Sequence, residues 1–193
     1  MKRVLVLYAH PCEESFAATL KGRVVSVLQA SGWEVDLCDL YAERFDPVMT
    51  AQERRNYLEV PANSVPVQAY VDRLRAAQAL VFVYPVWNFG FPAILKGFVD
   101  RVFLPGVSFR LEKGRLKPHL THIRTLAAIT TYGATPLRAF LAGDPPRRFL
   151  KRVLRHACQA KKVRYMALHD MNRVSAADRQ RYLARVERQM ERL

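Results

Sequence analysis

The chain has 193 residues, half of them hydrophobic, and a formal net charge of +14. This length and apolar content predict one folded domain over residues 1–193 and exclude an intrinsically disordered chain. No apolar run approaches the ~20 residues that a bilayer span needs, which excludes a membrane-spanning protein.

The first predicted strand is the apolar run Val4–Tyr8, and a helix from Ser15 to about Ala30 follows it after a short loop. Ser15 is a good N-cap residue. A helix that begins directly after a strand offers unpaired N–H groups and the positive end of its dipole to an anion. The chain has neither a Walker lysine nor a GxGxxG run, so neither a P-loop nor a dinucleotide fingerprint is present.

The three cysteines, Cys12, Cys38 and Cys158, are odd in number, widely spaced and without a CxxC pair. This pattern argues against a disulfide framework and a zinc site, and it is typical of a cytoplasmic protein. Cys12 lies in the first strand-to-helix loop, where small tyrosine phosphatases carry Cys-x5-Arg to grip phosphate. Ala18 stands at the arginine position, which excludes that reaction.

The next two elements are a strand at Trp33–Cys38, indicated by alternating polarity, and a helix over residues 64–77. Between them, Thr50-x-x-Glu53 has the spacing of a capping box and predicts the start of a short helix.

The run 80–84 is continuously apolar and predicts a buried strand, which we expect Pro85 to end because proline has no N–H for the ladder. A helix with one apolar face begins near Ala93. The loop between them, PVWNFGFP, places Trp87 and Phe89 at the carboxyl end of the strand, where open α/β sheets bind ligands. Two aromatic rings and the amide of Asn88 suit a planar ring that is stacked and hydrogen-bonded at its edge.

The last third of the chain contains two more predicted strands, Leu126–Ile129 and Val163–Leu168. An irregular excursion over residues 106–118 precedes them. An amphipathic helix is expected over 149–158, and Ser175-x-x-Asp178 opens the final helix. Strands that alternate with helices favour a three-layer α/β domain with a parallel sheet.

Several of these motifs resemble the flavodoxin-like NAD(P)H:quinone reductases and FMN-dependent azoreductases. The strongest is the loop 85–92 followed by Leu95-Lys96, which is similar to the family's flavin-binding loop. His10-x4-Ser15-Phe16 is similar to its first loop, and residues 130–133, TTYG, are similar to its Thr-Thr-Gly-Gly loop.

The resemblance implies a five-stranded parallel sheet of order 2-1-3-4-5 with helices on both faces. It also implies a flavin-dependent oxidoreductase that passes hydride from NAD(P)H, through FMN or FAD, to quinones or related electrophiles. A homodimer is expected, since the aromatic side chains of Trp87, Phe89 and Phe109 lie in loops that would otherwise be wet. The flavin-binding residues implied by the resemblance are His10, Ser15, Phe16, Ala17, Pro85, Val86, Trp87, Asn88, Phe89, Thr130, Thr131, Tyr132 and Gly133.

The chain departs from the family after Thr131. Tyr132 replaces the first glycine of the loop. Its phenol is expected to narrow or cover the flavin pocket or to donate to the flavin edge, unless the side chain turns outward and does neither. The quinone-reductase branch has a tyrosine and a histidine at the positions of Arg138 and Asp144. We assign no catalytic residue, because hydride transfer between stacked rings requires no acid–base pair.

Two other functions stay open, although the family's electron carriers tend to be acidic and this chain is strongly basic. One is a flavin-holding electron carrier that accepts no hydride, and the other is a regulatory protein that uses a basic surface on the same scaffold. Basic residues gather over 147–155 and 179–188, which is typical of solvated helix faces or of a surface that attracts an anionic partner. No recognition helix, zinc finger or aromatic–basic pattern supports nucleic acid as that partner.

Overall fold

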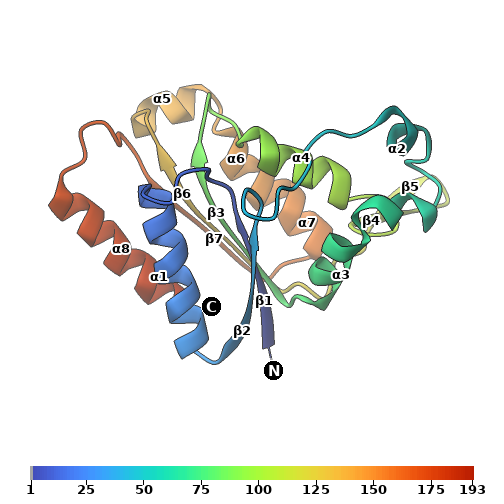
Figure 1. Ribbon diagram of the computed structural model, residues 1–193, viewed down its shortest axis with the longest axis horizontal. Helices are drawn as coiled ribbons and strands as arrows, with labels where there is room; N and C mark the ends of the chain where they lie inside the picture. Colours follow the sequence, from blue (N-terminus) through green and yellow to red (C-terminus); the bar gives the residue numbers. More distant parts are fainter. Residues whose placement is uncertain (1) are drawn as a thin grey trace.

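Five parallel strands form the central sheet of the computed structural model, which describes residues 2–193 (Figure 1). Their order in space is β2-β1-β3-β6-β7, which is the order 2-1-3-4-5 that the resemblance implied. The strands are β1 (Lys2–Tyr8), β2 (Trp33–Asp39), β3 (Ala79–Val86), β6 (Thr125–Tyr132) and β7 (Lys162–Leu168).

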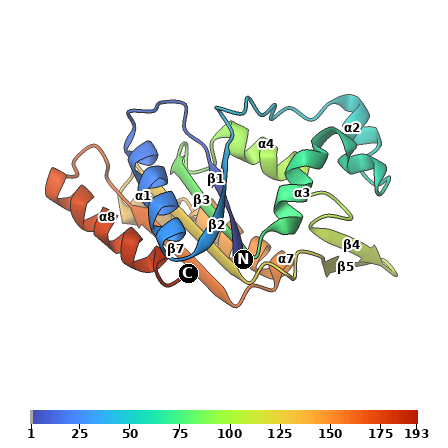
Figure 2. The same cartoon turned by 60° about the horizontal axis from the view of Figure 1, so that its bottom comes forward.

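Helices cover both faces of this sheet, so the α/β prediction is confirmed (Figures 1 and 2). One face carries α1 (Phe16–Ala30) and α8 (Ala176–Met190). The other carries α3 (Gln68–Ala76), α4 (Ala93–Val102) and the helical segment of residues 145–158. None of the helices within residues 2–193 is long and apolar enough to cross a membrane.

The two hydrophobic cores follow from the alternation of side chains along the strands. In β1, Val4, Val6 and Tyr8 pack toward α1 and α8. Leu5 and Leu7 pack toward the opposite layer. All eight residues of β3 and of β6 are buried, as expected for central strands covered on both faces.

Strand β3 does not end at Pro85, contrary to the sequence prediction. Pro85 pairs with Thr131 of β6, and the strand continues to Val86. The carbonyl of Val83 accepts a hydrogen bond from the Ala9 N–H, so Val83 directs its backbone groups toward β1. The backbone nitrogen of Pro85, two residues later, faces the same neighbour. The β1 ladder has already ended at Tyr8, and the missing N–H of Pro85 therefore breaks no ladder bond.

The excursion over 106–118 contains a regular antiparallel hairpin, which is a second correction. Strands β4 (Phe109–Glu112) and β5 (Arg115–Pro118) pair with each other and lie on the far side of the molecule from α1 and α8 (Figure 2). The turn residues Lys113 and Gly114 have φ values of +50° and +73°. Two consecutive positive φ angles are typical of the tight turn that matches the twist of a hairpin.

Shorter helices connect the main elements. The predicted helix over 64–77 begins as a 3-10 helix, and its α-helical part is only α3. The capping boxes at Thr50 and Ser175 are confirmed. The remaining helices are α2 (Ala51–Arg55), η1 (Ala62–Val67), α5 (Pro136–Leu141), α6 (Pro145–Arg148), the π-helical η2 (Phe149–Leu154) and α7 (Arg155–Cys158).

Candidate functional site

A pocket of about 540 Å³ lies at the carboxyl ends of β1, β3 and β6, beside the start of α1. Parallel α/β sheets bind their ligands at this edge. We call it the edge pocket. It is lined by His10, Ser15, Phe16, Ala17, Pro85, Val86, Trp87, Asn88, Thr131, Gly133, Met171 and Asn172.

The start of α1 forms the polar end of the edge pocket. The Ser15 side chain caps the helix, accepting a hydrogen bond of 3.1 Å from the Ala18 N–H. The first-turn N–H groups of Phe16 and Ala17 have no acceptor within the helix, and both residues line the pocket. Unpaired amides and the helix dipole together favour an anion here.

His10 is fixed in orientation next to this helix start. Its Nδ1 accepts a 3.0 Å hydrogen bond from the backbone N–H of Cys12. The proton of the neutral imidazole therefore lies on Nε2, which remains able to donate. The imidazole packs edge-on against the Trp87 indole, with ring centroids 5.9 Å apart.

A tight turn at residues 87–90 presents the aromatic wall of the edge pocket. Trp87 and Gly90 exchange backbone hydrogen bonds of 3.3 and 2.8 Å. Between them, Asn88 and Phe89 have φ values of +48° and +58°. Left-handed conformations cost non-glycine residues roughly 1–3 kcal/mol and cluster at functional sites. Trp87 is 41% exposed, so a planar ring can pack against its indole. The Phe89 side chain lies outside the lining of the pocket.

The end of β6 contributes backbone rather than large side chains. Gly133 lines the pocket, and a Cβ built on it meets nothing within 4 Å, so the space above its backbone is open. Thr131 also lines the pocket. Thr130 does not, because its side chain is fully buried, and its hydroxyl oxygen has no hydrogen-bond partner among the described residues.

Tyr132 does not cover the edge pocket, and both expectations for its phenol are wrong. Its side chain is 1% exposed, and the ring stacks on His169 at 4.5 Å. The hydroxyl donates a 2.6 Å hydrogen bond to Oδ1 of Asp144 and also meets the hydroxyl of Tyr165. Strand alternation explains this placement, since Tyr132 and Thr131 project from opposite faces of β6.

The Tyr132 phenol donates to the Asp144 carboxylate in a partly buried hydrogen bond, and its pKa shows that it keeps its proton. Burial raises the pKa of the Tyr132 phenol well above its usual range, and the hydrogen bond to Asp144 raises it further. Burial likewise raises the pKa of Tyr165. Both phenols therefore stay protonated at neutral pH. Asp144 stands where the family that the sequence resembles has a histidine, and here its carboxylate accepts the hydrogen bond from Tyr132.

The structure adds two residues that the sequence reasoning missed, Met171 and Asn172. They lie in the loop after β7, which a hydrogen bond of 3.0 Å from the Met171 N–H to the Tyr132 carbonyl ties to the end of β6. The signal that could have found them is topological, because the end of the fifth strand lies at the same sheet edge as the other loops.

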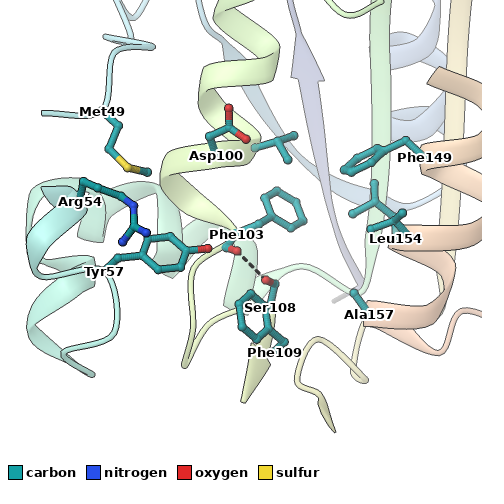
Figure 3. A pocket seen from close by; sticks show the side chains of 12 residues that line it. Met49, Arg54, Tyr57, Asp100, Phe103, Ser108, Phe109, Phe149, Leu154 and Ala157 are labelled. Atoms are coloured by element: carbon teal, nitrogen blue, oxygen red, sulfur yellow. Dashed lines mark hydrogen bonds between the residues drawn. The ribbon is translucent and has the colours of Figure 1, made fainter. Parts of the chain in front are cut away.

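A second pocket, of about 560 Å³, lies between α2, α4 and residues 149–157 (Figure 3). Phe109 lines this pocket rather than the edge pocket. The Ser108 hydroxyl points into this region and donates a 2.7 Å hydrogen bond to the Phe103 carbonyl (Figure 3). The second pocket also contains polar groups, Arg54 and Asp100 among them, but none of the described residues of the parallel sheet lines it. Because parallel sheets bind ligands at the carboxyl ends of their strands, the edge pocket is the candidate site.

Comparison with known proteins places these features in context. A family model described as having a flavodoxin-like fold matches residues 2–192. NAD(P)H dehydrogenase [quinone] 1 of Cavia porcellus is 32% identical over 150 residues, which cover 69% of this chain and 54% of that protein. The chain spans about half the length of several curated relatives that it matches.

Solved structures match over the whole chain. Smu.1420 of Streptococcus mutans UA159 has a TM-score of 0.83 at 30% identity, covering 99% of this chain and 100% of that one. The FMN-dependent NADH-azoreductase of Bacillus anthracis str. Ames Ancestor, solved in complex with FMN, has a TM-score of 0.81 at 16% identity. That match covers 100% of this chain and 99% of the other. At such low identity the second match concerns the fold alone.

Proposed function

The chain belongs to the family of proteins with a flavodoxin-like fold, and from this premise we propose that it is a flavin-dependent NAD(P)H oxidoreductase. Its acceptors would be quinones or related electrophiles. The observation that carries the proposal is the edge pocket itself. Unpaired helix amides and an aromatic turn converge there at the carboxyl edge of a parallel sheet.

The residues of the edge pocket fit FMN. The first-turn amides of Phe16 and Ala17, with the Ser15 cap, would hold the phosphate. Glu13 and Glu14 are exposed and do not line the pocket, so solvent and salt weaken their repulsion of this anion. The volume of about 540 Å³ falls within the usual range for cofactor sites.

The ring end of the site would be formed by the loops after β3 and β6. The Trp87 indole offers an apolar face, and Asn88 adds an amide that can hydrogen-bond at a ring edge. The open backbone at Gly133 admits a polar ring edge without steric conflict. Thr130, Tyr132 and Phe89 would act through their backbone or by shaping these loops, since their side chains lie outside the pocket lining.

Bound FMN would supply the redox chemistry, accepting hydride from a nicotinamide and passing it to an acceptor. The chain's own side chains would bind and orient the rings and exclude water. The buried phenol of Tyr132 would move no proton to the site, because Asp144 already accepts its hydrogen bond. The acceptor and the nicotinamide would use the same face in turn, which predicts ping-pong kinetics.

We propose FMN rather than FAD, and the FMN complex of the azoreductase with the same fold supports this choice. A homodimer is also proposed. Leu137, Phe140 and Leu141 of α5 are 66%, 73% and 74% exposed, an apolar patch of the kind that partner subunits cover. Phe109 does not support a dimer interface beside the edge pocket, because it lines the second pocket.

The test combines cofactor identification with reduction. We expect the purified protein to carry FMN, or to gain thermal stability when FMN is added, since a ligand that binds the native state stabilises it. Anaerobic NADPH or NADH should then bleach the flavin absorbance, which an electron carrier that takes no hydride would not do. Protein that binds neither FMN nor FAD would overturn the proposal.

A further inference from the structure

A recess of about 300 Å³ lies on the opposite side of the Tyr132 layer from the edge pocket, between α5, residues 143–152 and His169. We call it the basic recess. It is lined by Pro136, Ala139, Phe140, Gly143, Asp144, Arg147, Arg148, Lys151, Arg152 and His169. Four of these residues are arginine or lysine, and they form two neighbouring pairs along α6 and η2 that face the same recess.

The cations of the basic recess are not neutralised within the chain. None of the ion pairs formed among residues 2–193 includes Arg147, Arg148, Lys151 or Arg152. The lining contains one carboxylate, that of Asp144, against four basic side chains, so the recess keeps an excess of positive charge. A cluster of like charges at this density repels itself, and an anion in the recess would relieve that repulsion.

His169 adds a second, independent observation. Its Nδ1 is buried and has no hydrogen-bond partner in the described part of the chain. The ring is held flat against Tyr132, so it cannot turn to seek solvent without losing that stack. A buried ring nitrogen without a partner costs stability unless a ligand completes its hydrogen bonding.

An apolar groove of about 660 Å³ adjoins the basic recess. The groove and the basic recess share Gly143, Arg148 and Arg152. At its other end the groove is lined by Gly90 and Phe91, which directly follow the Trp87–Asn88 turn of the edge pocket. A ligand with an aromatic ring beside this turn could therefore run along the groove and place an anionic group among the cations.

We propose that the basic recess binds the 2′-phosphate of NADPH and so makes the enzyme prefer NADPH over NADH. The inference rests on the proposed function, since it names the coenzyme that the reductase would use. A recess of about 300 Å³ suits a phosphate monoester with its ribose and not a whole nucleotide. Arginine side chains grip phosphate oxygens in pairs, and those bonds are about twice as strong as neutral hydrogen bonds.

The test compares adenosine 2′,5′-bisphosphate with adenosine 5′-monophosphate by calorimetry on FMN-loaded protein. The variant Arg147→Gln/Lys151→Gln removes two cations that line the basic recess but neither the groove nor the edge pocket. Arg155→Gln, one turn further along the helix and outside the recess, is the matched control. We expect the native protein to bind the bisphosphate at least about tenfold more tightly, and the double variant to lose this preference.

Kinetics give the second readout. The KM for NADPH should rise about tenfold in the double variant while the KM for NADH stays within about twofold, and Arg155→Gln should resemble the native protein. Equal affinity of the native protein for both nucleotides, or an equal loss in the control, would overturn the proposal. Inorganic phosphate that binds as tightly as the bisphosphate would assign the recess to free phosphate instead.

The two proposals fail in different ways. If neither coenzyme reduces the bound flavin, the proposed function is wrong, and the calorimetric preference still decides whether the basic recess recognises a 2′-phosphate. If both coenzymes reduce the flavin with the same KM and the nucleotides bind alike, only the assignment of the basic recess is wrong.

Discussion

The substitution Ser15→Asp separates phosphate binding at α1 from helix capping. Aspartate caps helices about as well as serine, so the hydrogen bond now made to the Ala18 N–H is retained and the fold is kept. The new carboxylate lies beside the first-turn amides that would hold the FMN phosphate. At a separation of about 5 Å, one added charge repels a phosphate dianion by about 1.7 kcal/mol even in a water-like dielectric.

That repulsion corresponds to a loss of FMN affinity of roughly fifteenfold, and more where the effective dielectric is lower. Ser15→Asn is the matched control, because it also caps the helix but carries no charge. Fluorescence titration should show weaker FMN binding for Ser15→Asp than for Ser15→Asn. Riboflavin, which lacks the phosphate, should bind both variants alike. Equal FMN affinities, or an equal loss for riboflavin, would refute the placement of the phosphate.

Three further predictions concern packing, hydrogen bonding and pH. Gly97→Ala should lower the free energy of unfolding by about 1–3 kcal/mol despite alanine's helix preference, because its Cβ would lie 2.3 Å from the Pro47 backbone. Tyr132→Phe should cost about 1–3 kcal/mol by leaving Asp144 without its donor, and it should leave the rate of flavin reduction unchanged. Glu53→Gln should cost about 1 kcal/mol at pH 7, because glutamine keeps the capping box but loses the charged hydrogen bonds from Arg101, and the cost should disappear in acid.

The sign of the Glu53 effect follows from its pKa. Burial alone would raise that pKa, but hydrogen bonds from Thr50 and the Arg101 guanidinium outweigh burial and lower it in the folded state. The stabilisation is therefore complete above the unfolded pKa and is lost as the pH falls through the folded one. Urea unfolding at several pH values measures the stability of all three variants. The rate of flavin reduction in Tyr132→Phe is measured separately. A stable Gly97→Ala protein, slowed reduction in Tyr132→Phe or a pH-independent Glu53→Gln effect would contradict the respective argument.

Most strands and helices could be predicted because their signals are local and one-dimensional, whereas the sheet order was implied by the resemblance to a known family. The apolar run before Pro85, the cap at Ser15 and the turn at 87–90 each mark the end of a strand or the start of a helix. Resemblance to a known family then added the residue assignments. What those signals do not contain is the face of the sheet on which each side chain lies.

The errors come from that missing information. Side chains alternate along β6, so Tyr132 and Thr131 lie on opposite faces of the sheet. The prediction placed all four residues of the TTYG loop at the flavin pocket. Pro85 is tolerated inside β3 because the neighbouring ladder has already ended, which depends on the relative lengths of two strands. The hairpin turn at Lys113-Gly114 had a recognisable glycine signal, but its strands are short and exposed, so their pattern is weak.

The measurement that tests the central claim most directly is an anaerobic titration of the purified protein, after its bound flavin has been released from a portion and identified by mass. The account predicts FMN at one per chain and bleaching of the flavin absorbance by one equivalent of NADPH, followed by reoxidation when a quinone is added. Protein that binds no flavin, or whose bound flavin stays oxidised with both NADPH and NADH, would contradict it.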